Sequence, residues 1–301
     1  MSRITRGVFK WNIFDYINVL LLAVLTIITF YPMYYVILVS LNDPNDTILG
    51  GMYLFVRKFT LENFVFFFNN KGFLDSFIIS VSRTLLGASL SVLFTALFAY
   101  GMSKPYLVGR KFFITVMIIT MYISGGLIPY FILIKNLGLY KNFFVFIYPL
   151  MFSAYNAIIM ITYFKGIPSE IEESVLVDGG NDFTIFFRII LPISTPVIAT
   201  IALFNAVHQW NSWFDAMVFG GRDLMTLQAR LVEIIRDVDA AHKLASQGNM
   251  GVADLAMKGF KPNLESIKAT AMVVAAVPII LVYPFLQRYF VKGIMIGSLK
   301  G

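Results

Sequence analysis

Long runs of apolar residues recur along this chain, and they limit the folds open to it more than any other feature. The first run reads YINVLLLAVLTIITFYPMYYVILVSL. A helix of about 20 apolar residues spans the ~30 Å hydrocarbon core of a bilayer. Hydrophobic residues make up 58% of the 301 residues, more than a soluble domain of this length needs for its core. The sequence therefore predicts an integral membrane protein.

The apolar runs also predict the type of secondary structure. Each run is continuous, whereas the strands of a membrane barrel alternate apolar and polar residues. The expected fold is all-α, with six transmembrane helices. They are expected at about 14–40, 74–102, 112–134, 143–165, 193–219 and 268–290.

Lysines and arginines in the short loops predict the direction of the spans, because these residues concentrate on the cytoplasmic side. With a cytoplasmic N-terminus, the larger set lies inside and the smaller set outside. The inside set is Arg3, Arg6, Lys10, Lys104, Arg110, Lys111, Lys165, Arg188, Arg288, Lys292 and Lys300, and the outside set is Arg57, Lys58, Lys71, Lys135 and Lys141. Six spans then place both termini in the cytoplasm and the long loop 220–267 outside.

An acidic segment ending in two glycines, IEESVLVDGG at 171–180, lies between the fourth and fifth predicted spans and so faces the cytoplasm. Ser169 followed three residues later by Glu172 fits a capping box. Gly179 and Gly180 provide a left-handed stop. The segment is predicted to be a short helix with both ends marked.

A second short helix, FTIFFRII, is expected to follow, with Asp182 as its cap and its end before Pro192. The first helix carries Ile171 and the apolar run Val-Leu-Val at 175–177 on only two or three turns and cannot bury them on itself. It therefore needs a surface to lie against. That surface is either its own bundle or a groove in a soluble partner.

The residues of this loop occur in a specific order: Glu-Ser-Val at 173–175, Asp-Gly at 178–179 and Ile-Ile-Leu-Pro at 189–192. This order resembles the cytoplasmic EAA loop of ABC importer permeases, in which Glu-Ala-Ala precedes a glycine and Ile-x-Leu-Pro. The chain departs from that pattern at Ser174 and at the bulkier Val175. SGGLIP, QWNSWF and the ending YPFLQRYFVKGIMIGSLKG extend the resemblance to the MalG-like permeases of carbohydrate importers, over nearly the whole chain.

This resemblance implies a type I ABC importer permease whose loop 166–192 forms a coupling helix in a cleft of the ATPase. It also implies a second, related permease in a heterodimer, a dimer of ATP-binding cassette subunits and an extracytoplasmic solute-binding protein. The setting it implies is the lipid of the bacterial inner membrane. The coupling residues carried over are Glu172, Glu173, Asp178, Gly179, Gly180, Leu191 and Pro192.

The chain contains no motif for catalytic chemistry of its own. There is no Gly-Lys dipeptide and hence no phosphate loop, and HExxH and GxSxG are also missing. The lack of cysteine excludes disulfides and thiolate metal sites. The chain is predicted to be no enzyme and to hold no cofactor or metal, with ATP and Mg used by the partner ATPase. The net charge of +7 reflects basic residues that flank spans and does not indicate nucleic-acid binding.

Polar residues within the fifth predicted span are candidates for a solute path. Asn205, His208, Ser212 and Asp215 are spaced three, four and three residues apart, which predicts one polar stripe on a helix. The stripe is either a hydrated path for a hydroxyl-rich solute or a set of hydrogen bonds to another helix. Asn211, in the same stretch, is a further candidate.

Three larger side chains within the predicted spans are also candidates. Trp210 and Trp213 either belong to an interfacial aromatic belt or stack on sugar rings. Arg83 either faces a cavity or bonds carbonyls or an acid of another helix.

We expect the permease half of an ATP-driven oligosaccharide importer, and Arg83 and the net charge favour an acidic sugar such as a uronate of the alginate type. An ABC permease for a non-sugar solute is one alternative. A secondary transporter driven by an ion gradient is another, with Asp215 as its one candidate carboxylate. A membrane scaffold explains the spans but not the cytoplasmic loop.

We expect cysteines introduced singly at Ser174 and Ser246 to react with membrane-impermeant reagents from opposite sides of the membrane. The reason is that 166–192 is predicted inside and 220–267 outside. The chain contains no cysteine, so each label reports one position. Labelling of both positions from the same side would contradict the six-span topology.

Overall fold

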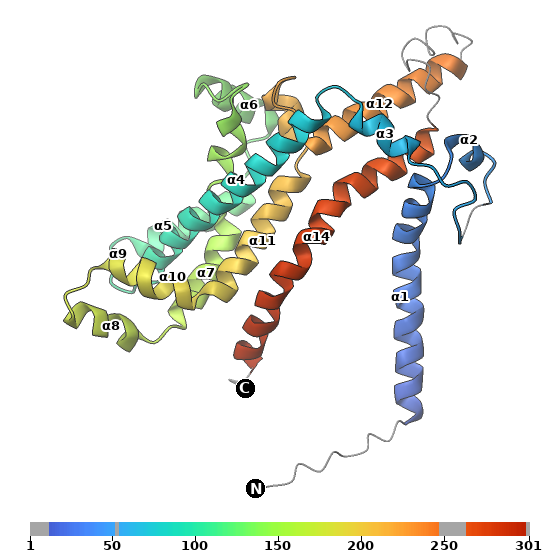
Figure 1. Cartoon of the computed structure of the whole chain (residues 1–301). Helices are drawn as coiled ribbons and strands as arrows, with labels where there is room; N and C mark the ends of the chain where they lie inside the picture. Colours follow the sequence, from blue (N-terminus) through green and yellow to red (C-terminus); the bar gives the residue numbers. More distant parts are fainter. Residues whose placement is uncertain (1–11, 52–53, 247–262, 299–301) are drawn as a thin grey trace. The chain divides into compact units, whose positions relative to one another are not determined.

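The computed structural model describes residues 12–51, 54–246 and 263–298, which form helices, turns and one isolated bridge between Asn42 and Phe59. The predicted all-α class is confirmed for these residues. Figure 1 shows the helices. In chain order they are α1 (Ile13–Ser40), α2 (Pro44–Thr47), α3 (Glu62–Phe68), α4 (Phe73–Ser103), α5 (Arg110–Tyr122), α6 (Leu127–Asn136), η1 (Phe143–Phe146), η2 (Tyr148–Leu150), α7 (Ala154–Lys165), α8 (Ser169–Val177), α9 (Asp182–Ile185), η3 (Phe186–Ile190), α10 (Leu191–Ile193), α11 (Thr195–Asn211), η4 (Ala216–Gly220), α12 (Leu227–Ser246) and α14 (Leu264–Ser298).

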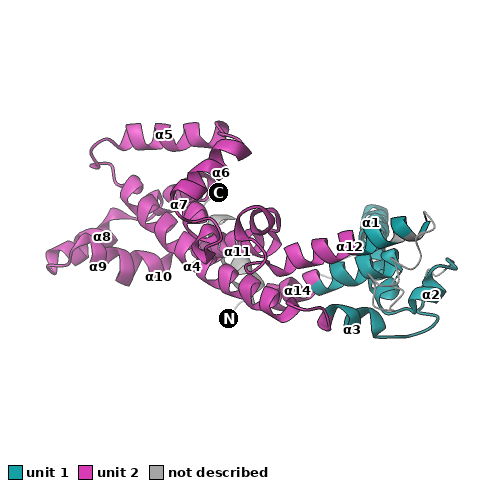
Figure 2. Cartoon of the chain, turned by 90° about the horizontal axis from the view of Figure 1, so that it is seen from above, with its two compact units in different colours: residues 1–67, 238–274 teal, residues 68–237, 275–301 magenta. Residues whose placement is uncertain are grey.

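The chain divides into two compact units (Figure 2). One unit comprises residues 1–67 and 238–274, and the other comprises 68–237 and 275–301. Among the described residues, three helical segments are long and apolar enough to cross a membrane: α1, α4 and the Leu264–Pro284 part of α14. Three bent helix pairs raise the number of candidate spans to six.

The second unit is built around α4, α7 and α11, which pack against one another (Figure 1). Their shared core contains the buried residues Ala96 and Ala99 of α4, Ala157 and Met160 of α7, and Ile201 of α11. Alanines at a contact let helix backbones approach closely, which is how helices gain packing energy where water exclusion no longer drives them together. The residues of the candidate functional site lie on this bundle or on the segments that connect its helices.

The predicted third span, 112–134, is not one helix. It consists of α5 and α6, which meet at an angle of 120° across 123–126. Gly126 has φ +79°, a left-handed conformation that ends the regular helical path and that glycine adopts without strain. The SGG sequence at 124–126 therefore marks a helix break that the continuous apolar run does not indicate.

The predicted fourth span, 143–165, is also interrupted. Its first part forms the 3₁₀ turns η1 and η2, and only α7 is α-helical. Pro149 lies in η2 and has no backbone N–H to donate, while Ser153 starts a new helix by accepting the N–H of Asn156 at 3.3 Å. In contrast, α14 extends beyond the predicted 268–290 at both ends.

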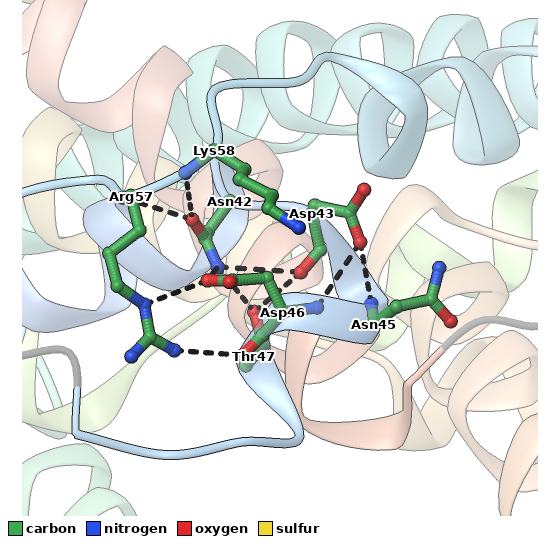
Figure 3. A network of polar contacts seen from close by, with 7 residues as sticks. All are labelled: Asn42, Asp43, Asn45, Asp46, Thr47, Arg57 and Lys58. Carbon is green, nitrogen blue, oxygen red and sulfur yellow. Dashed lines mark hydrogen bonds and ion pairs between the residues drawn. The ribbon is translucent and has the colours of Figure 1, made fainter.

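The first unit contains a folded polar turn directly after α1 (Figure 3). Asn42 is fully buried, and its Nδ2 donates to Asp46 at 3.0 Å while its Oδ1 accepts the backbone N–H groups of Arg57 and Lys58. Arg57 Nε donates to the same carboxylate at 2.8 Å. The hydrogen bond from Asn42, helped by Arg57, lowers the pKa of Asp46 despite its burial. The turn is thereby held by hydrogen bonds and by the ion pair between Arg57 and Asp46.

Candidate functional site

The acidic loop between α7 and α11 begins with α8, whose N-cap is Pro168 and not Ser169. Ser169 is the first helical residue, so the predicted capping box with Glu172 is wrong. Pro168 has φ −58° and ψ 136°, an extended conformation that already ends the preceding turn and lets the helix begin immediately after it. Glu170 and Glu172 lie in the first turn, where carboxylates are favoured by the helix dipole.

The end of α8 agrees with the predicted glycine stop. The N–H of Gly179 donates to Leu176 O at 3.0 Å, and the N–H of Gly180 donates to Val175 O at 2.8 Å. Gly179 has φ +78° and is the left-handed residue. Gly180 is needed for space, because a Cβ there would lie 2.5 Å from Val175 Cγ1. The two glycines therefore serve different purposes.

The second short helix differs from its prediction at both ends. Asn181 is the cap, with its Oδ1 accepting the N–H of Thr184 at 2.9 Å, and Asp182 is the first helical residue. The chain continues through the π-helical turn η3 into α10, so Pro192 lies inside a helix and does not end one. It is the second residue of α10, next to Leu191, near a helix start where a proline is tolerated. The chain then turns by 82° into α11.

The short helix α8 has two distinct faces. Glu172 and Val175, one turn apart, are partly buried, and Val175 packs against the core of α4, α7 and α11. Glu172 forms an ion pair with Lys104, the residue that ends α4. Leu176 and Val177 point outward and are 52% and 87% exposed. Glu173 and Asp178 are exposed as well. The predicted coupling residues are therefore divided between an inward and an outward side.

The second part of the site surrounds Arg83, which has no exposed surface. Its Nη2 donates to Asp215 Oδ2 at 2.6 Å, and its Nε and Nη2 donate to Gln209 Oε1 at 3.0 and 2.8 Å. Its guanidinium carbon lies 4.5 Å from the centre of the Phe146 ring. Of the two interpretations given for Arg83, the structure shows the bonded acid of another segment.

Gln209 is a residue of this site that the sequence interpretation missed. It accepts from Arg83, and its Nε2 donates to Phe146 O at 3.0 Å, so one amide joins three segments. Gly87 makes room for it, because a Cβ there would lie 2.4 Å from Gln209 Nε2. A buried amide in an apolar helix signals a hydrogen-bonded partner, and this signal was present in QWNSWF.

The predicted polar stripe does not lie on one helix. The helix α11 ends at Asn211, Ser212 is extended with ψ 117°, and Asp215 caps η4 by accepting the N–H of Ala216 at 2.9 Å. Asn205 points to the bundle, where its Oδ1 accepts from Asn156 of α7 at 3.1 Å. A regular helix would have kept the members of the stripe together, but the break after Asn211 separates them.

An open groove of about 690 Å³ lies at the end of α11. His208, Asn211 and Trp213 line it and are exposed, and Trp213 is 37% exposed. The full lining is Leu203, Phe204, Val207, His208, Asn211, Ser212, Trp213 and Phe214. The groove thus offers neutral hydrogen-bonding groups and an indole on a mostly apolar wall.

Trp210 faces away from this groove. It is 6% exposed, its Nε1 donates to Ala275 O of α14 at 3.0 Å, and Phe77 meets it edge-to-face at 6.2 Å. Trp210 neither belongs to an interfacial aromatic belt nor is accessible for stacking on a sugar, because its ring is packed between helices. Trp213 is the indole that remains accessible.

The bundle of broken helices, with the short helix α8 between α7 and α11, is the arrangement expected of the membrane subunit of a transporter. Residues 68–296 match the binding-protein-dependent transport system inner membrane component family, and the chain belongs to this family. The predicted class, an ABC importer permease with a type I fold, is confirmed.

Individual relatives extend this similarity over nearly the full length. The polygalacturonan/rhamnogalacturonan transport system permease protein YtcP of Bacillus subtilis is 35% identical over 97% of this chain and 100% of its own. Protein LplC of the same organism is 35% identical over 96% of each chain. A chain in the crystal structure of a bacterial ABC transporter involved in the import of the acidic polysaccharide alginate has a TM-score of 0.81 at 29% identity, covering 92% of this chain and 96% of that one.

We expect Arg83→Met to destabilise the folded permease by about 3 kcal/mol, the low end for breaking a buried pair, because Asp215 is left without its cation but keeps some solvent contact. The double variant Arg83→Met/Asp215→Asn should recover most of the loss. Thermal unfolding in detergent measures both. A double variant no more stable than Arg83→Met would show that the pair is not what stabilises this site.

Proposed function

We propose that this chain is the permease subunit of an ATP-driven importer of an acidic oligosaccharide. The observation that carries the proposal is α8, a nine-residue helix that holds its inner face on the bundle and presents Leu176 and Val177 outward. Exposed apolar side chains on so short a helix require a covering surface. A cleft in a separate ATPase provides one.

The proposed assembly has four kinds of partner in a bacterial inner membrane. They are a second, related permease, two ATP-binding cassette subunits, an extracytoplasmic solute-binding protein and the solute. The ATPase subunits hold ATP and Mg. The family description, an inner membrane component of a binding-protein-dependent system, supports this arrangement. Both termini and α8 are proposed to lie in the cytoplasm.

The groove at the end of α11 is the proposed contribution of this chain to the solute path. His208 and Asn211 can exchange hydrogen bonds with hydroxyl groups, and Trp213 can stack on the apolar face of a sugar ring. No Asp, Glu, Lys or Arg lines the groove, so a solute is bound and released without separating a buried ion pair. Weak binding is required, because a tightly held solute would not be released.

The acidic nature of the solute is supported by the similar proteins and not by Arg83. One relative is named for transport of polygalacturonan and rhamnogalacturonan, and the similar structure for import of alginate. Arg83 has no exposed surface and is paired with Asp215, so its charge cannot meet a solute in this conformation. The expectation that Arg83 favours an acidic solute is therefore withdrawn.

We expect proteoliposomes holding this permease, its partner permease and its ATPase to take up short oligouronides delivered by the binding protein. The matched control is the same oligosaccharide with its carboxylates reduced to alcohols, which differs only in charge. ATP hydrolysis and uptake should respond to the acidic form by at least ~tenfold over the reduced form, the effect of about 1.4 kcal/mol. Equal response to both forms would refute an importer selective for acidic sugars.

We expect Glu173→Lys to weaken association with the ATPase by roughly tenfold, because Glu173 is exposed on the outward side of α8 and a reversed charge there loses a polar contact of ~1.5 kcal/mol. Co-purification of the ATPase with the permease measures this. Glu62→Lys is the control, since it makes the same change at an exposed position predicted to lie outside. Unchanged association in Glu173→Lys would mean that α8 does not dock through this side.

A further inference from the structure

The lysine that ends α4 is held more closely than a basic residue in a cytoplasmic loop normally is. The side chain of Lys104 is 11% exposed, and its ammonium lies 4.2 Å from the centre of the Tyr100 ring. It forms an ion pair with Glu172, whose side chain is 19% exposed. A charge this buried needs both its carboxylate and its aromatic neighbour, so the contact is a specific one.

Glu172 belongs to the inward face of α8, together with Val175. Val175 packs on the core of the bundle, while the exposed Glu173 and Leu176 lie on the outward side. Two neighbouring glutamates in one short helix therefore have different partners. Glu172 binds within this chain, and Glu173 is free to contact another.

Tyr100 connects this ion pair to the rest of the cytoplasmic loop. Its ring lies 5.3 Å from that of Phe186 in η3 and 6.4 Å, edge-to-face, from that of Phe164 in α7. Phe186 and Phe164 are both buried. The ends of α4 and α7 and the loop after α8 thus pack together around one aromatic cluster.

The helix α4 carries a second buried ion pair, that of Arg83 with Asp215, in its first half. Arg83 and Lys104 are separated by about 30 Å of helix at 1.5 Å per residue. Arg83 forms an ion pair with Asp215, which is the N-cap of η4. This ion pair therefore fixes the chain at the break between α11 and η4, and the groove lies beside that break. One continuous helix therefore joins the segment proposed to dock on the ATPase to the segment that forms the groove.

We propose that Lys104 is a positioning residue that ties the coupling helix α8 to α4, so that displacement of α8 by the ATPase is passed through α4 to the groove. This rests on the proposed docking of α8. The role differs from that of Glu173, because Lys104 and Glu172 act on each other within the chain. Loss of their ion pair leaves the outward side of α8 able to dock but no longer fixed to the helix that it must move.

The test is a charge exchange in the assembled transporter. Lys104→Glu and Glu172→Lys should each retain ATPase association. In each variant the solute-stimulated rate of ATP hydrolysis should fall at least ~fivefold, the lower end of coupling between distant sites. Lys104→Glu/Glu172→Lys should regain most of it, and Lys104→Arg should behave as wild type, since arginine can bind a carboxylate and stack on an aromatic ring. Lys111→Glu, at an exposed lysine on the same predicted side, is the matched control and should couple normally.

A second measurement requires neither the ATPase nor a solute. A spin label on Ser174→Cys reports the mobility of α8 in the full chain, which has no other cysteine. The label should become more mobile in either single variant and regain its order in the exchanged pair. It therefore separates failure of this link from failure of the proposed function. Should Lys104→Glu prevent insertion, Lys104→Gln removes the same ion pair without placing two acids together.

Two results would overturn the proposal. One is a Lys104→Glu variant whose solute-stimulated ATP hydrolysis and label mobility are those of the wild type. Where that variant does not insert, the same result in Lys104→Gln counts. The other is an exchanged pair as impaired as the worse single variant, which would show that Lys104 and Glu172 act through other partners.

Discussion

A guanidinium without exposed surface is the constraint on which the bundle depends. Each N–H of Arg83 needs an acceptor, because an unpaired buried charge costs several kcal/mol. The acceptors are Gln209, the Asp215 carboxylate and Ser212 O. Asp215 reaches Arg83 while capping η4, which begins only after α11 has ended. The carboxylate that pairs with Arg83 is thus supplied where α11 has ended, and the groove lies at that break.

The sequence predicted the features that are set by neighbouring residues. The stop at Gly179 and the long helices α1 and α4 depend on local backbone preference and continuous apolarity, so they were found. The caps at Pro168 and Asn181 were each placed one residue too late, because the next residue is also a good cap and only the backbone geometry decides between them.

The breaks in the spans and the real site were not predictable in the same way. Apolar content decides whether a segment enters the bilayer, but it does not report whether the helix is continuous there, as at Gly126 and after Asn211. Gln209 and Lys104 acquire their roles from residues far along the chain, Arg83 and Glu172. Periodicity assigned Asn205 and Asp215 to one face, and tertiary contacts placed them in different environments.

In the proposed importer, the groove would provide only one side of the solute path. All of its lining comes from residues 203–214, one stretch of chain that forms a wall on one side only. Binding sites that hold a small molecule firmly bury most of its surface. A one-sided wall of neutral and apolar groups holds a sugar weakly and leaves the opposite side to another surface. Weak binding suits a carrier that must release its solute, and the open side is where the proposed second permease would close the path.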